Sequence, residues 1–211
     1  FTAKGLEVTL VEGNAAQPSI PELLSGRAQF GIGHAGVLIE HLRGEPLVAC
    51  AAVFQHSPYV ILSRRDRGIA TPNDLVGTRV MLSEDQGAFQ FRAMLQGEGI
   101  HASRIEMVPH SWDLEDLVER RVDAVSAYSG VEPEQLRARG VEPSVLRTTD
   151  YGVDFYGDIL FTSASEVERD PERVAAFVRA SMRGWEYAFA HPEELADRFK
   201  FARQKSKLAG T

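Results

Sequence analysis

The side chains best suited to bind a small molecule lie in short polar segments beside apolar runs. The clearest segment is Gln55–Pro58, which separates the apolar runs Leu47–Phe54 and Tyr59–Ser63. Aromatic faces suit a flat ring, and carboxylates accept hydrogen bonds from its N–H groups. We therefore predict a small-molecule site, without a cofactor, from these residues: Asn14, His34, Gln55, His56, Ser57, Tyr59, Asp85, Gln86, Tyr128, Glu132, Tyr151, Asp154 and Tyr156.

The same residues give weaker support to catalysis or metal binding. His56 and Ser57 could be a base and a nucleophile, but adjacent residues on an extended strand point to opposite faces. His34, His56 and a carboxylate could bind zinc, but no HxH or HExxH spacing accompanies them. The glycines of Gly31–Gly36 have dinucleotide-site spacing, yet no acidic partner follows about 20 residues later. We expect a binding domain and not an enzyme.

Composition narrows the class of protein further. The 211 residues carry a formal net charge of −7, and no basic patch with interleaved aromatic residues appears, which argues against nucleic-acid binding. No apolar run approaches the roughly 20 residues that span a bilayer. Cys50 is the single cysteine, so an intrachain disulfide and a multi-cysteine site are excluded. The abrupt start at Phe1 predicts a trimmed or mature chain.

Two strands are predicted to cross between two lobes. The run Leu47–Phe54 does not alternate, which is typical of a strand buried on both sides of a parallel sheet. Pro58 ends it, and Tyr59–Ser63 continues as a strand into a second lobe. Asp158–Ser163 is the predicted return crossing. We expect an α/β, two-lobed fold with a hinge and a central cleft, in which residues 1–63 and 158–211 form lobe 1 and residues 64–157 form lobe 2.

Strands and helices alternate along the rest of the chain. Further strands are predicted at Leu6–Val11, Ala28–Gly33, Thr78–Ser83, Arg104–Pro109, Val122–Tyr128 and Ser144–Thr149. Asp170 and Pro171 open the longest helix, whose apolar stripe from Val174 to Phe189 predicts a core-facing side that includes Trp185. An ungapped echo relates Leu23–His34 to Leu117–Tyr128, and it places His34 and Tyr128 at equivalent strand ends.

Several segments resemble a known family. Leu23–Gly33, Phe54–Pro58 and Thr71–Gly77 resemble the thiamine-pyrimidine-precursor-binding family of periplasmic solute-binding proteins. Asp150–Ser163 and Gly184–Ala188 resemble a branch found as sensor domains of histidine kinases and diguanylate cyclases. The resemblance covers nearly the whole chain and implies two α/β lobes joined by two crossing strands.

The resemblance also implies a ligand and a setting. Family members hold a pyrimidine between aromatic rings, and the carboxylate on its amino group corresponds to Glu132, although Val131 replaces a usual asparagine. The family's first strand and helix would lie upstream of Phe1. The resemblance implies an extracytoplasmic sensor input attached to membrane signalling segments. The alternatives are a free binding protein that serves an ABC permease and a pyrimidine synthase, whose cysteine cluster Cys50 alone cannot supply.

Overall fold

The computed structural model describes residues 5–11, 18–83 and 86–198. Contacts divide the chain into two compact units, one formed by Phe1–Gln29 with Thr162–Thr211 and the other by Phe30–Phe161. The predicted lobe boundaries, at 63/64 and 157/158, stay a prediction. No helix among the described residues is long and apolar enough to cross a membrane.

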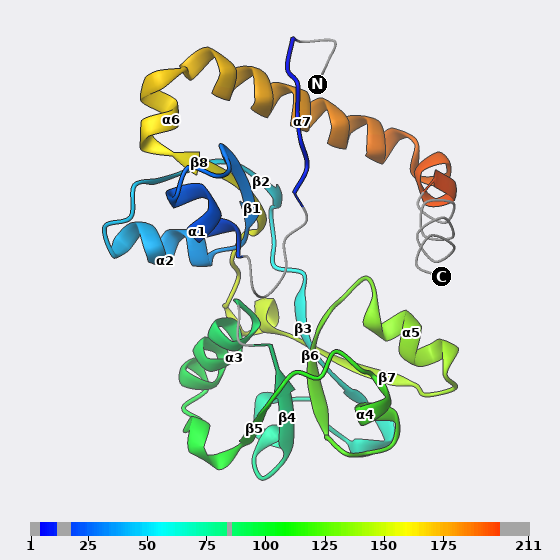
Figure 1. Ribbon diagram of the computed structural model, residues 1–211. Coiled ribbons are helices and arrows are strands. Elements are labelled where there is room, and N and C mark those ends of the chain that lie inside the picture. The colour runs from blue at the N-terminus through cyan, green and yellow to red at the C-terminus, as the bar shows by residue number, and fades with distance from the viewer. Residues whose placement is uncertain (1–4, 12–17, 84–85, 199–211) are drawn as a thin grey trace. The chain divides into compact units, whose positions relative to one another are not determined.

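A five-stranded mixed sheet dominates the second unit (Figure 1). Its strand order is β5 (Glu106–Pro109), β4 (Arg79–Leu82), β6 (Ala124–Tyr128), β3 (Tyr59–Arg64) and β7 (Pro143–Arg147). β4 runs parallel to β5 and β6, whereas β3 is antiparallel to β6 and β7. The carboxyl ends of β4, β5 and β6 therefore share one edge of the sheet with the start of β3.

Helices bury both faces of this sheet. Ile61 of β3 belongs to the apolar cluster that contains Phe91 and Met94 of α3 (Gln86–Gly97). The neighbouring Val60 and Leu62 belong to the opposite cluster, with Leu117 of α4 (Glu115–Val118) and Leu136 of α5 (Glu132–Ala138). Because successive strand residues point to opposite faces, a strand covered on both sides has no polar alternation. The uninterrupted burial of Tyr59–Ser63 follows from this position.

A three-stranded sheet has the order β1 (Phe30–Gly33), β8 (Gly157–Ser163) and β2 (Leu47–Phe54). Phe161 packs so closely on Gly31 that a Cβ there would lie 2.5 Å from Cζ of the ring. The predicted bounds of β2 are confirmed, but its predicted burial on both sides is wrong. β2 ends the described strand order, and most of its residues are half-buried or exposed.

The remaining elements are mostly short. The helices are α1 (Ser19–Leu24), α2 (Gly36–Leu42), α6 (Ala164–Arg169) and α7 (Pro171–Ala190), with helical structure again at 192–198. The 3-10 segments are η2 (Arg65–Arg67), η3 (Pro72–Leu75), η4 (Ala102–Arg104) and η5 (Thr148–Tyr151). A capping box opens η3: the Thr71 side chain accepts the Asp74 backbone N–H, and the Asp74 carboxylate accepts the Thr71 backbone N–H.

Two predictions about packing are wrong. Leu6–Val11 is not a strand, and Leu10 stays 87% exposed because no described strand pairs with this segment. The longest helix is confirmed as α7, but none of its described residues is buried. Trp185 is 40% exposed and Phe189 is 74% exposed, so the end of the stripe is not core. Periodicity shows that a helix has an apolar face and leaves open what covers that face.

The two segments related by the internal echo also share a backbone conformation at one position. Gly26 follows α1 with a φ of +76°, and Arg120, which matches it in the echo, follows α4 with a φ of +61°. Glycine adopts this left-handed conformation easily, whereas arginine rarely does. The Arg120 guanidinium binds Asp66 at 2.7 Å, which gives this turn a contact that glycine could not make.

Packing of α3 on the five-stranded sheet gives a direct test. Phe91 is fully buried and the nearby Phe89 is 51% exposed on the same helix. Phe91→Ala should lower the free energy of unfolding in urea by about 3–5 kcal/mol, because it removes a buried ring and leaves a cavity. Phe89→Ala should change it by about 0.5 kcal/mol or less. Equal effects of the two substitutions would contradict this packing.

Candidate functional site

A buried amide joins the two connections between the sheets. Gln90 of α3 is fully buried. Its Oε1 accepts hydrogen bonds from Ser57 Oγ at 2.5 Å and from Thr148 Oγ1 at 3.2 Å. Ser57 lies between β2 and β3, and Thr148 opens η5 on the way to β8. Nε2 of Gln90 has no hydrogen-bond partner within the described part of the chain. This amide therefore couples both connections to one helix.

Asp154 links the two connections directly. One carboxylate oxygen lies 2.6 Å from His56 Nδ1, and the other accepts the Ser57 backbone N–H at 2.9 Å. The His56 side chain is 81% exposed, so solvent screens this ion pair. The hydrogen bond from His56, followed by that from the Ser57 backbone, lowers the pKa of Asp154. Three predicted site residues, His56, Ser57 and Asp154, thus meet at one point.

An aromatic pair lies at the shared edge of the five-stranded sheet. Tyr59 starts β3 and Tyr128 ends β6, and their ring centroids are 4.9 Å apart. Gly87 packs on the Tyr59 ring so closely that a Cβ would lie 2.7 Å from Cε1. Glu132, at the start of α5, accepts the Tyr128 backbone N–H through Oε2 at 2.8 Å. The structure therefore brings Tyr59, Tyr128 and Glu132 together, and their role in ligand binding stays a prediction.

The other predicted residues are more scattered. Gln55 donates to the Ala52 carbonyl at 2.8 Å, and Tyr151 packs against the α3 side of the core. Tyr156 is 54% exposed. His34 follows β1 and accepts the Gly36 N–H at Nδ1. Asn14, Asp85 and the Gln86 side chain lie outside the described residues.

Asp158 of β8 is a titratable group that the sequence prediction did not select. Burial raises its pKa, while the charge of His34 acts in the opposite direction. Cys50 of β2 is half-buried, and burial raises the pKa of its thiol. Across the described ranges, no group of three His, Cys, Asp or Glu side chains could hold a metal ion.

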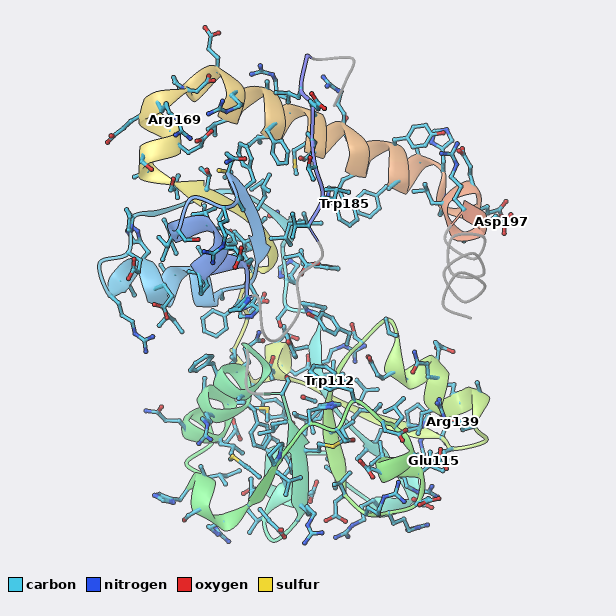
Figure 2. The ribbon with its side chains drawn as sticks, viewed as in Figure 1. Trp112, Glu115, Arg139, Arg169, Trp185 and Asp197 are labelled. Carbon is cyan, nitrogen blue, oxygen red and sulfur yellow. The ribbon has the colours of Figure 1, made fainter. Side chains whose placement is uncertain are left out.

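The sequence prediction did not select Gln90 or Trp112, although the sequence contains a signal for each. Gly87, Gln90, Phe91, Met94 and Leu95 have the helical spacing of one buried stripe, and Gln90 is its polar member. Trp112 follows β5, at the same sheet edge as the residues that end β4 and β6 (Figure 2). The rule that selected other strand-end loops applies equally to this one.

Comparison with known proteins identifies the family of this chain. The sequence profile described as NMT1/THI5 like matches residues 1–195. The chain belongs to the NMT1/THI5-like family. This membership confirms the predicted kinship with thiamine-precursor-binding proteins.

Two curated relatives of this NMT1/THI5-like chain are named as binding proteins. It is 26% identical over 203 residues to the riboflavin-binding protein RibY of Chloroflexus aurantiacus, covering 93% of this chain and 58% of that protein. It is 25% identical over 203 residues to the formylaminopyrimidine-binding protein of Halalkalibacterium halodurans, covering 92% and 60%. The chain thus spans less than two thirds of either relative. Neither relative is named as an enzyme, in agreement with the sequence prediction.

Solved structures identify the fold. The periplasmic aliphatic sulphonate-binding protein SsuA of Escherichia coli aligns with a TM-score of 0.63 and 18% identity, covering 85% of this chain and 61% of that one. The predicted α/β fold of two-lobed, type II periplasmic binding proteins is confirmed. At this identity the likeness concerns the fold alone, because ligand choice depends on side chains that the fold does not specify.

The Gln90 amide gives a stability test. Gln90→Leu should lower the free energy of unfolding by about 1–3 kcal/mol, because the Ser57 and Thr148 hydroxyls lose their shared acceptor. The cost of losing this acceptor exceeds the gain from removing the unpaired Nε2 amide group of Gln90. The control is Gln96→Leu, an exposed position on the same helix, which should stay within about 0.5 kcal/mol of the parent. Urea unfolding measures both, and a Gln90→Leu protein as stable as the parent would refute the coupling.

The lowered pKa of Asp154 predicts that the stability of the protein depends on pH. Its pKa is lowered on folding, so its contribution is complete above the ordinary aspartate pKa of about 3.9 and disappears as pH falls through the folded value. Asp154→Asn should therefore be less stable than the parent at pH 6, and the difference should shrink below pH 4. The exposed Asp150 provides the control as Asp150→Asn. A difference that persists undiminished at pH 2 would contradict the assignment.

Proposed function

We propose that this chain is the ligand-binding part of an extracytoplasmic solute-binding protein, and that its solute is a planar heteroaromatic molecule. The observation that carries the proposal is the grouping of Tyr59, Tyr128 and Glu132 at the carboxyl edge of the parallel strands. Ligands of open α/β sheets bind at this edge. The names of the two curated relatives support the same class, since riboflavin and formylaminopyrimidine both contain flat nitrogen heterocycles.

Glu132 is the proposed polar anchor. Its Oε2 is held by the Tyr128 N–H, which fixes the carboxylate beside the tyrosine pair. A carboxylate accepts hydrogen bonds at both oxygens, so an amino or ring N–H of the ligand has an acceptor there. The predicted pairing of Glu132 with a pyrimidine amino group belongs to this proposal.

The charge of the site disfavours simple anions. Among the described site residues, Glu132 and Asp154 are carboxylates, and no lysine or arginine belongs to the set. An aliphatic sulfonate at this edge would lie near the Glu132 and Asp154 carboxylates, which repel an anion. The likeness to SsuA therefore supports the fold, while the side chains favour a neutral or cationic ring.

Binding is further proposed to serve as the sensor input of a membrane signalling protein. The support is the resemblance of Asp150–Ser163 and Gly184–Ala188 to the sensor branch of the family. Delivery of the solute to an ABC permease is the alternative output. The two differ when the longer protein carrying this chain is assayed with ligand: a change in kinase or cyclase activity supports the sensor, and ligand-dependent transport supports delivery.

Calorimetry and thermal shift with formylaminopyrimidine, riboflavin, thiamine and ethanesulfonate test the ligand class. A heteroaromatic ligand at 100 times its Kd should stabilise the protein by about 2.7 kcal/mol. Glu132→Gln keeps an acceptor for the Tyr128 N–H but loses the charge, and it should weaken binding at least about tenfold, or about 1.4 kcal/mol.

The matched control is Glu134→Gln, at an exposed position of the same helix where the glutamate pairs with Arg137. It should bind like the parent. Stabilisation by ethanesulfonate, with none by the three heteroaromatic compounds, would overturn the proposed ligand class.

A further inference from the structure

Trp112 is exposed and conformationally unusual. Its side chain is 76% exposed, and its backbone φ is +63°. A bulky residue rarely adopts this left-handed conformation, and such outliers concentrate at functional positions. If the turn needed only a positive φ, glycine would supply it at lower cost. The observation that needs an explanation is a large ring displayed to solvent from a strained position.

His110 holds the ring in place. The Trp112 backbone N–H donates to His110 Nδ1 at 2.9 Å, so Nδ1 is unprotonated and Nε2 carries the hydrogen. Nε2 then donates to the Ser126 carbonyl oxygen at 3.0 Å. The imidazole and indole stack with centroids 4.5 Å apart and planes inclined by 28°. The imidazole thus covers one face of the indole and is itself anchored to β6.

The hydrogen bond from His110 to Ser126 makes the loop after β5 pass the end of β4. β4 lies between β5, which precedes the loop, and β6, which receives the His110 bond. Ser126 also accepts the N–H of Ser83, the residue after β4, at 3.0 Å. Ser126 stands two residues before Tyr128. The loop that carries Trp112 therefore spans the end of β4 and is fixed to the strand that ends in the tyrosine pair.

We infer that Trp112 is a ligand-stacking residue. The indole face that His110 leaves uncovered receives the planar ring of the solute, at the same sheet edge as Tyr59 and Tyr128. This inference rests on the proposed function and adds a residue to it. Stacking on an aromatic face tolerates many flat rings, so Trp112 favours heteroaromatic over aliphatic solutes and leaves the distinction between rings to polar groups such as Glu132.

Fluorescence isolates this residue, because the chain has two tryptophans, Trp112 and Trp185. In a Trp185→Phe protein, saturating formylaminopyrimidine should quench or shift the remaining Trp112 emission. In the matched Trp112→Phe protein, where Trp185 of α7 is the remaining reporter, this change should be absent. By calorimetry, Trp112→Ala should weaken binding at least about tenfold, the order expected for the loss of one stacked ring. Trp185→Ala should bind like the parent.

The outcomes separate the two proposals. Unchanged affinity in Trp112→Ala, or unchanged Trp112 emission at saturation, overturns the stacking role while heteroaromatic binding stands. If none of the heteroaromatic probes gives a binding heat or a shift in melting temperature with the parent protein, the proposed function is overturned, and the stacking role with it. Melting of the ligand-free Trp112→Ala protein at the parent temperature establishes that weaker binding comes from the lost ring and not from unfolding.

Discussion

The buried side chain of Gln90 is the constraint on which the candidate site depends. A single carbonyl oxygen accepts hydroxyl groups from Ser57 and Thr148, which belong to different connections between the two sheets. A buried hydroxyl without an acceptor is costly, so both connections have to hold their positions together. Ser57 Oγ also accepts the N–H of Tyr59, the first residue of β3. The start of β3, and with it the tyrosine pair, is therefore positioned from α3.

Much of the fold could be predicted because the decisive signals are local. Tyr59–Ser63 and Ala124–Ala127 are buried on both faces of a sheet, and this environment favours the mostly apolar runs visible in the sequence. The same reasoning failed for Leu47–Phe54. An apolar run at the end of the described strand order has the composition of a central strand, and its exposure depends on neighbours that the run does not specify.

The site was predictable in part, for a related reason. Strand-end loops identify Tyr59, Tyr128 and Glu132, because the carboxyl edge of parallel strands follows from the strand order. The hydrogen bond between His56 and Asp154, which are 98 residues apart, could be predicted only by knowing which connections lie side by side. Gln90 has the periodicity of a core residue, and its polarity could be explained only once its partners Ser57 and Thr148 were known. The strand-end position of Trp112 could be read from the sequence, but its proposed role depends on how His110 anchors a loop to β6.

The arrangement also explains how one fold can serve unlike ligands. SsuA, named for aliphatic sulphonates, has this fold at 18% identity, so the sheets and helices do not choose the solute. In this chain, the groups proposed to choose it lie at one edge of the five-stranded sheet, at the start of β3, the end of β6 and the first turn of α5. They are aromatic rings with the Glu132 carboxylate. A neutral ring avoids charge repulsion at this edge, whereas an anion would be desolvated beside the Glu132 carboxylate. Under the proposed function, selection of a flat, hydrogen-bond-donating solute therefore depends on these side chains, and the sheet edge that carries them sets how precisely the solute is held.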